Sequence, residues 1–192
     1  MVGVRFTSTK RGDSSLLFGW MAVCLCFLAL GNLAFHERWL PVSPDGVQRL
    51  SSHFSFGYQS FEGFSTFLWA VIKSALWDIA SVLLIAFSRI LTVRRGFLGA
   101  VFACKSLILG YCGALIIGSI GTFDSFWQGF LSWLFFFMYH VLVLSALFCF
   151  GIATVSFQPS KSSRALYFMT VVGEIALVVF LKTIYYLLIS II

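Results

Sequence analysis

The sequence predicts an all-α fold, an integral membrane bundle of five transmembrane helices in a single domain over residues 1–192. Apolar residues make up 60% of the chain and charged residues only 10%. The apolar residues gather in five stretches of roughly 20 residues or more, and about 20 helical residues cross the ~30 Å hydrocarbon core of a bilayer. The three prolines lie between these stretches, so no proline interrupts a helix. The predicted spans are residues 16–35, 64–88, 97–120, 126–157 and 166–192.

The first stretch, 16–35, follows Lys10 and Arg11, as the apolar part of a secretory signal would. It is longer than the roughly 7 to 15 apolar residues of a signal, and the residues at its end are too large for a cleavage site. We therefore interpret it as an uncleaved span. Cleavage would leave four spans.

The segment 36–63, between the first two spans, is predicted to be an external loop. Prolines, aspartate and glycine in its first half are typical of turns, and aromatic residues alternate with serine and glycine in its second half. Aromatic rings favour the headgroup region of a membrane. The loop is therefore a candidate surface for an extracytoplasmic partner, and the alternative is a cap over the outer end of the bundle.

Basic residues beside the spans predict the orientation of the chain. If the N-terminus is cytoplasmic, the cytoplasmic side carries Arg5, Lys10, Arg11, Arg89, Arg94, Arg95, Lys161 and Arg164, whereas the other side carries only Arg38 and Arg49. This asymmetry follows the positive-inside rule, so we expect the N-terminus in the cytoplasm and the C-terminus outside. Topology and attraction to anionic lipid account for the net charge of +6 without a nucleic-acid partner.

Small residues recur along the third span at intervals of three and four. They are Gly99, Ala103, Ser106, Gly110 and Gly113, which share one helix face. In a bilayer, small residues let two helix backbones approach closely. This face is therefore predicted to pack within the bundle and to make the third helix its centre, although a dimer interface would use the same pattern.

Ionisable side chains inside the spans are the candidate functional residues: Asp78, Lys105, His140 and Glu174 form a candidate intramembrane polar network. A charge near the bilayer centre is costly, so such groups normally face the bundle interior and pair. At 1.5 Å per residue, Asp78, Lys105 and Glu174 lie about 10 to 17 Å from the cytoplasmic ends of their helices, and His140 lies in the outer half. Lys105 is therefore expected to pair with Asp78 or Glu174.

Two further lysines, Lys73 and Lys182, fall in the outer half of their spans by the same count. Their long side chains are expected to extend toward the outer surface. The polar network itself has two interpretations, a path for protons or ions and a set of contacts that fix the register of the helices.

The sequence predicts no cofactor, no metal site and no catalytic residue. The cysteines at positions 24, 26, 104, 112 and 149 lie inside the spans and lack the spacing of metal ligands, so they are expected to pack as small apolar residues. The chain also has no phosphate loop, nucleophile elbow or zinc-helix motif.

A tryptophan-containing apolar run opens the second span, and a basic, glycine-rich run opens the third. The residues are Phe67, Leu68, Trp69 and Trp77, then Arg94, Arg95, Gly96, Phe97, Leu98, Gly99 and Ala100. In these features and in its arrangement of spans, the stretch 67–157 resembles the stage II sporulation protein M family of five-span membrane proteins. The resemblance implies a scaffold without catalytic residues. In endospore formers the family member looks like an anchor that gathers two cell-wall hydrolases, an amidase and a lytic transglycosylase, at the septum.

We therefore expect a non-enzymatic scaffold or anchor protein of the cell membrane. Its expected partners are the lipid bilayer and membrane or extracytoplasmic proteins, and the resemblance implies cell-wall hydrolases among them. The alternative is a small transporter or channel subunit that uses the intramembrane charges. A membrane-embedded enzyme is a third class.

Overall fold

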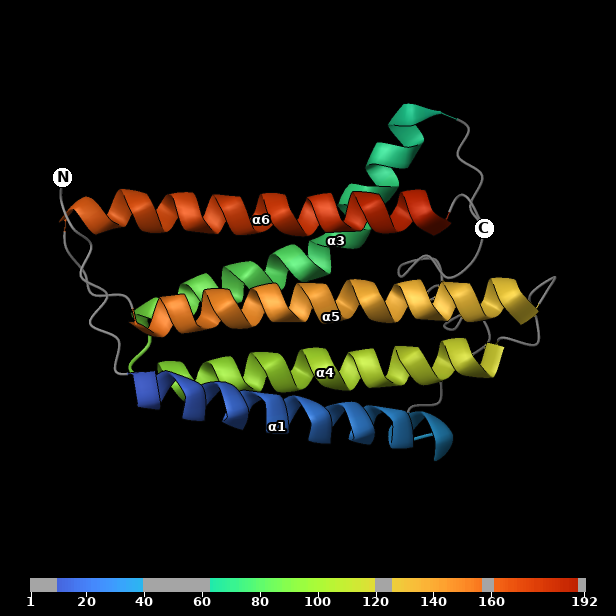
Figure 1. The fold of residues 1–192 in the computed structure, drawn as a ribbon, viewed down its shortest axis with the longest axis horizontal. Helices are drawn as coiled ribbons and strands as arrows, with labels where there is room; N and C mark the ends of the chain where they lie inside the picture. Colours follow the sequence, from blue (N-terminus) through green and yellow to red (C-terminus); the bar gives the residue numbers. More distant parts are fainter. Residues whose placement is uncertain (1–9, 40–62, 120–125, 157–160, 190–192) are drawn as a thin grey trace.

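The computed structural model describes residues 10–39, 63–119, 126–156 and 161–189, and this part of the chain is an all-α bundle without a β-strand. Five α-helices and one short 3₁₀ turn form it (Figure 1). They are α1 (Lys10–His36), α3 (Phe64–Phe87), η1 (Ser88–Ile90), α4 (Arg94–Ser119), α5 (Phe126–Ser156) and α6 (Lys161–Ile189). The predicted external loop lies, for residues 40–62, outside the described residues.

All five helices are long and apolar enough to cross a membrane, so the predicted fold class is confirmed. The helices extend beyond the predicted spans at the ends where the chain is charged. Helix α4 begins at Arg94 rather than at residue 97, and α6 begins at Lys161 rather than at residue 166. Hydropathy reports only the part of a helix inside the hydrocarbon layer, and the helical backbone continues into the polar headgroup region.

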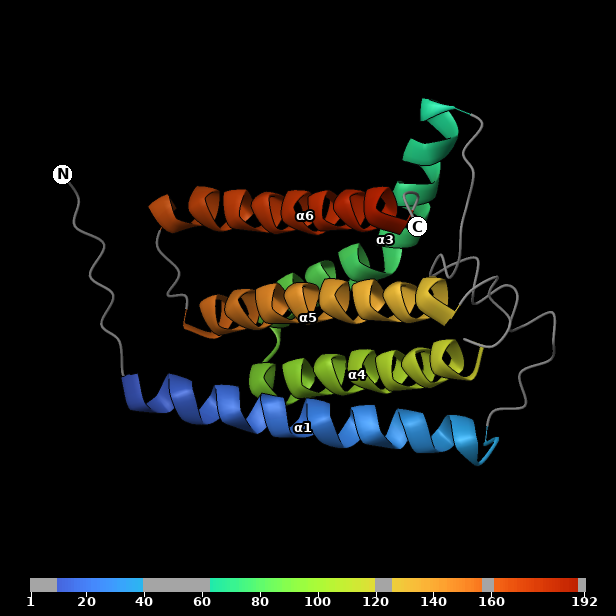
Figure 2. The same ribbon diagram turned by 45° about the vertical axis from the view of Figure 1, so that its right-hand side comes forward.

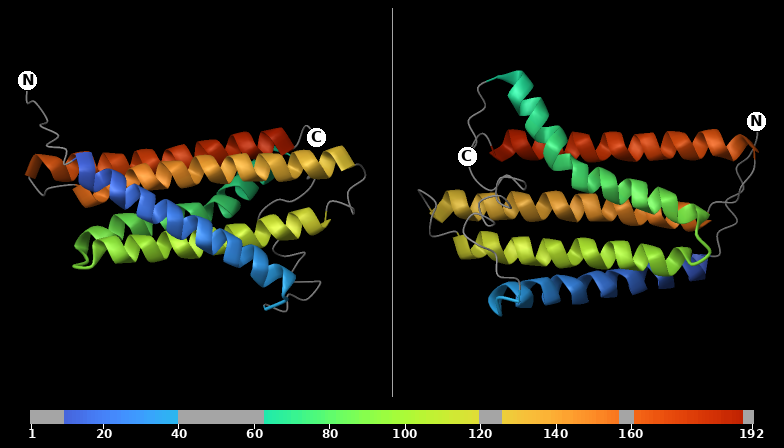
Figure 3. Two further views of the ribbon diagram at one scale, coloured as in Figure 1. Left: turned by 60° about the horizontal axis from the view of Figure 1, so that its bottom comes forward. Right: turned by 180° about the vertical axis from the view of Figure 1, so that it is seen from behind.

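Four helices lie side by side in the order α1, α4, α5, α6, and α3 crosses behind α5 and α6 (Figures 1 and 2). The first turns of α3 extend past α6, away from the other helices (Figure 1). Views from below and from behind show the same arrangement, with α3 lying diagonally across α6 (Figure 3). Helices α1, α4 and α6 begin at the end where α3 and α5 finish. We call it the basic end, because Arg89, Arg94, Arg95 and Arg164 lie there.

The prediction that the third helix is the centre of the bundle is right for burial and wrong for contacts. Helix α4 has the largest buried share of the five spans, 56%. It packs against α1, α3 and α5 but does not reach α6, whereas α5 contacts all four other helices. The reason is the linear order of the helices, which places α5 between α4 and α6 (Figure 1).

Helices α1 and α4 approach each other at two glycines, one on each helix. A Cβ atom at Gly31 would collide with the carbonyl oxygen of Leu107 and would lie 2.9 Å from the backbone nitrogen of Tyr111. A Cβ atom at Gly110 would collide with the carbonyl oxygen of Leu28. Each glycine therefore packs directly on the backbone of the other helix, which is the close approach that small residues permit in membranes.

The small-residue face of α4 is thus used inside the bundle, against α1. Gly99 lies beside Trp20, with its would-be Cβ 3.9 Å from the indole nitrogen, and Ala103 and Ser106 are buried. Gly113 departs from the prediction, because no atom lies within 4 Å of its would-be Cβ. Gly31, the glycine of α1 that packs against this face, was not predicted from the sequence.

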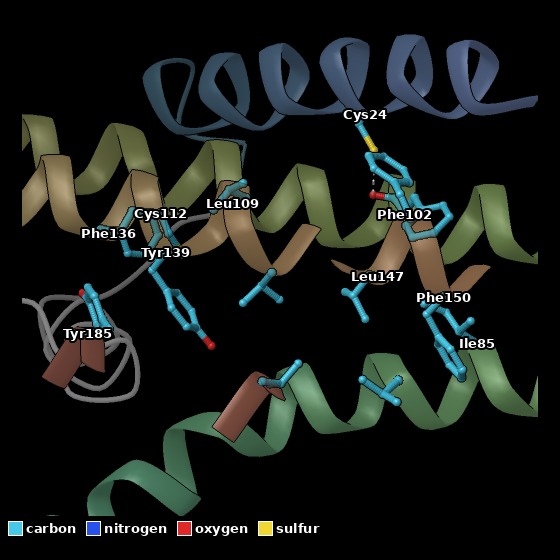
Figure 4. Packing of buried hydrophobic residues seen from close by; sticks show 14 of the residues in the cluster. Cys24, Ile85, Phe102, Leu109, Cys112, Phe136, Tyr139, Leu147, Phe150 and Tyr185 are labelled. Carbon is cyan, nitrogen blue, oxygen red and sulfur yellow. Dashed lines mark hydrogen bonds between the residues drawn. The ribbon is translucent and has the colours of Figure 1, made fainter. Parts of the chain in front are cut away.

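An aromatic layer fills the bundle between α1, α4 and α5. The rings of Trp20 and Phe102 lie 5.0 Å apart between centroids, and those of Phe102 and Phe148 lie 4.6 Å apart. Figure 4 shows Cys24 of α1 beside Phe102 and Leu147 of α5 in the same interior. Apolar side chains on the outer faces of the helices are exposed, as expected for surfaces in contact with lipid.

Candidate functional site

The candidate site is a cluster of ionisable and hydroxyl side chains in the interior of the bundle. Asp78 of α3 is only 2% exposed, and Lys105 of α4 is 5% exposed. The Lys105 ammonium donates a hydrogen bond to Oδ1 of Asp78 and forms an ion pair with it. It also lies 3.5 Å from the hydroxyl of Ser81, which shares a helix face with Asp78. Of the two partners expected for Lys105, the structure therefore places Asp78 beside it.

Tyr139 of α5 binds the second oxygen of the same carboxylate. Its phenolic hydroxyl donates a hydrogen bond of 2.6 Å to Oδ2 of Asp78. Both oxygens of Asp78 are thus bound to donors on other helices, Oδ1 to α4 and Oδ2 to α5. Buried carboxylates require such partners, because a buried charge without them is strongly unfavourable.

Lys182 of α6 is the second cation of the cluster, and the prediction that it extends to the outer surface is wrong. Its side chain is 1% exposed, and its ammonium lies 4.4 Å from the ring centre of Tyr139. The rings of Tyr185 and Tyr186 are 5.1 and 5.9 Å away. Three tyrosine rings therefore surround the ammonium and stabilise its charge through cation–π interactions.

Counting residues from the helix ends put Lys182 and His140 in the outer half of the membrane, but this count does not give their distance from Asp78, because the helices differ in length and tilt. Helices α5 and α6 have 31 and 29 residues, and α6 extends beyond the start of α4 at the basic end (Figure 1). Helix α3, with 24 residues, crosses the bundle diagonally. Residues at different distances from their helix ends can consequently lie side by side.

His140 lies at the edge of the cluster. It is 5% exposed and packs against the rings of Phe136 and Tyr139, whose centroids lie 4.4 and 4.8 Å away. It is close enough to Asp78 and to both lysines to interact with them electrostatically. Together with Lys105, His140 also lines a cavity of about 10 Å³, which is about the space that one water molecule requires.

Glu174 does not join the cluster in the structure. It lies on α6 two turns before Lys182, at a spacing of roughly 12 Å along the helix, and its Oε1 atom is buried without a hydrogen-bond partner among the described residues. Lys73 is exposed on α3, as expected. Of the four predicted network residues, the structure thus brings together Asp78, Lys105 and His140.

Sequence reasoning missed the tyrosines of the cluster. Tyr185 and Tyr186 follow Lys182 by three and four residues, so the helical spacing alone places their rings beside the lysine. That signal was readable from the sequence. The hydrogen bond from Tyr139 to Asp78 was not, because it depends on which faces of α3 and α5 meet.

The cluster can hold helices together and can carry charge inside the bundle. It contains one carboxylate and two amines, joined through Tyr139 across α3, α4, α5 and α6. Among the described residues, no three histidine, cysteine or acidic side chains gather as metal ligands. The cluster is therefore a buried ion pair with an additional cation beside it.

Replacing Tyr139 with phenylalanine is expected to destabilise the protein by about 1.5–3 kcal/mol, because hydrogen bonds to charged groups contribute about that much. Thermal unfolding of the purified protein in detergent would measure the loss. The control is the same substitution in an Asp78→Leu background, where it should have almost no effect. An equal loss in both backgrounds would show that the hydroxyl of Tyr139 does not stabilise the protein through Asp78.

Comparison of the chain with models of protein families, with curated proteins and with solved structures gives no match in any of the three.

Proposed function

We propose that the chain is a non-enzymatic scaffold or anchor of the cell membrane, with its N-terminus in the cytoplasm and its C-terminus outside. The observation that carries this proposal is the buried polar cluster, whose strong contacts join the helices to one another. Asp78 is bound by Lys105 and Tyr139, and Lys182 is enclosed by tyrosine rings. Such contacts favour a fixed arrangement of helices, which suits a protein that positions others.

The extracytoplasmic end offers the surfaces that a partner would contact. Trp39, just after α1, is 57% exposed, and Phe64, at the start of α3, is 77% exposed. These two residues flank the segment 40–62, and the first turns of α3 extend away from the other helices (Figure 1). Exposed aromatic residues are enriched where proteins contact each other. Partner proteins are therefore proposed to bind here, and the resemblance described above suggests cell-wall hydrolases as their class.

Site-specific cross-linking in the native membrane tests the scaffold proposal. A photoreactive amino acid would replace Trp39 or Phe64 at the extracytoplasmic end, and Ile90 at the basic end would serve as the control because it is 72% exposed. We expect the same extracytoplasmic proteins to be captured repeatedly from Trp39 and Phe64 but not from Ile90. Capture of no recurring protein from either position would overturn the proposal.

The proposed orientation makes its own prediction. Single cysteines at Ile90 and Trp39, introduced into a chain without its native cysteines, should differ in their reaction with a membrane-impermeant maleimide. We expect labelling of intact cells at Trp39 only, and labelling at Ile90 only after the cells are opened. The reverse pattern would show that the basic end faces outward.

The second candidate is a small proton- or ion-coupled transporter, which one observation favours. Both oxygens of Asp78 are already bound, yet Lys182 is also buried next to the site. Among the described residues, no carboxylate forms a salt bridge with Lys182, and buried ionisable groups of this kind mark charge pathways in membrane proteins. In reconstituted vesicles, Lys182→Met should abolish proton or ion flux if transport is the function. If the wild-type protein conducts no flux, the transporter hypothesis is wrong.

A further inference from the structure

Four arginines gather at the basic end of the bundle, around the hinge between α3 and α4 and the start of α6. They are Arg89 in η1, Arg94 and Arg95 at the start of α4, and Arg164 in the first turn of α6, and Figure 1 shows these helix ends at the same end of the bundle. The sequence contains no acidic residue from position 79 to 123 or from 157 to 173, so neither segment that carries these arginines supplies a counter-charge. Asp13, in the first turn of α1, belongs to the same end but is outnumbered by these arginines, so this end carries an excess of positive charge.

Two of the arginines are held in place by contacts with the hinge and with α6. The guanidinium of Arg89 lies 4.5 Å from the ring centre of Tyr167, whose hydroxyl donates a 3.2 Å hydrogen bond to the carbonyl of Ala86. Arg94 donates from Nε to the carbonyl of Leu91 at 3.2 Å. Ordering these side chains in advance lowers the entropic cost of binding a ligand.

The apolar residues around the arginines indicate the depth of this end in the membrane. Ile90 and Val93 in the hinge are 72% and 70% exposed, and Leu166 and Phe168 at the start of α6 are 58% and 66% exposed. Apolar side chains this exposed are favourable against lipid, while arginines require a polar surrounding. Residues of both kinds within one or two turns place the hinge at the boundary between hydrocarbon and headgroups.

We propose that Arg94, Arg95 and Arg164, together with Arg89 on Tyr167, form a binding site for the phosphate group of an anionic phospholipid. Guanidinium groups bind phosphate oxygens in pairs of parallel hydrogen bonds, so arginine suits this ligand better than lysine does. The lipid leaflet is the source of phosphate at this depth, because its headgroups lie at the same level as the arginines. The site is independent of the proposed scaffold function.

The test measures lipid binding by the full-length protein in detergent. Phosphatidylglycerol and phosphatidylcholine with the same acyl chains would be titrated separately, with the melting temperature and the number of lipids retained in native mass spectrometry as readouts. The variant is Arg94→Gln with Arg95→Gln. The matched control is Arg38→Gln, which removes an exposed arginine at the opposite end of the bundle. Inorganic phosphate would be titrated in parallel.

The wild-type protein and Arg38→Gln should bind phosphatidylglycerol in preference to phosphatidylcholine. The double variant should bind phosphatidylglycerol about 25-fold more weakly, since each arginine near an anionic surface contributes about fivefold. Equal binding of the two lipids by the wild-type protein, or an equal loss in Arg38→Gln, would overturn the proposal. So would stabilisation by inorganic phosphate alone. If the double variant does not fold, Arg164→Gln should reduce binding about fivefold, and no reduction would overturn the proposal.

Discussion

Replacing Asp78 with leucine is expected to destabilise the folded protein by about 3–5 kcal/mol, because the substitution leaves the ammonium of Lys105 buried without a counter-charge. The hydroxyl of Tyr139 would lose its acceptor at the same time. Thermal unfolding in detergent would measure the effect as a large fall in melting temperature. Breaking a buried pair from one side costs more than the pair itself contributes, so the single variant measures the isolated cation and not the strength of the ion pair.

A second substitution, at Lys105, separates the cost of the isolated cation from the contribution of the ion pair. Changing Lys105 to methionine in the Asp78→Leu background removes the isolated ammonium and keeps a side chain of similar length. We expect the double variant to recover at least half of the lost stability, because buried ion pairs can often be replaced by apolar residues at little cost. If the losses of the two single variants simply add in the double variant, the two residues do not act as a pair.

The same variants distinguish the two functional hypotheses. If the cluster only fixes the positions of the helices, the double variant with Asp78→Leu and Lys105→Met should function normally once its stability is recovered. A cluster that carries charge should leave a stable but inactive double variant, because both ionisable groups are gone. The comparison of stability with function in one variant is therefore more informative than the loss of function in Asp78→Leu alone.

Alanine at Gly31 or at Gly110 is expected to separate α1 from α4 and to destabilise the protein by about 1–3 kcal/mol. The added methyl group would collide with backbone atoms of the facing helix, at Leu107 for Gly31 and at Leu28 for Gly110. Backbone atoms cannot move aside as a flexible side chain can, so the helices themselves must shift and lose contacts around the crossing. Unfolding measurements, or release of α1 to limited proteolysis, would detect the change.

Gly113 and Gly19 provide matched controls on the same two helices. No atom lies within 4 Å of a would-be Cβ at either position, so alanine there should be neutral or slightly stabilising. A loss at Gly113→Ala as large as that at Gly110→Ala would contradict the close crossing of α1 and α4. Equal behaviour of all four variants would mean that helix propensity alone decides the outcome.

The bilayer makes much of the fold readable from the sequence. Helices in hydrocarbon must satisfy their own backbone hydrogen bonds and must be long enough to cross, so apolar length predicts all five of them. The cost of burying a charge likewise predicts that Lys105 will find a carboxylate, and the structure places Asp78 beside it. The small-residue face of α4 predicts a close helix contact, which occurs at Gly110.

The sequence by itself thus determined the fold class, the five long apolar helices of the described residues and the need for polar contacts between them, because these follow from the lipid environment and from spacing along one helix. Only the tertiary structure decided which faces meet. It placed Gly31 against α4, enclosed Lys182 among tyrosines and left Glu174 outside the cluster. The physical reason is that relative tilt, length and rotation of helices depend on packing between segments far apart in the chain, and no periodicity within one segment encodes them.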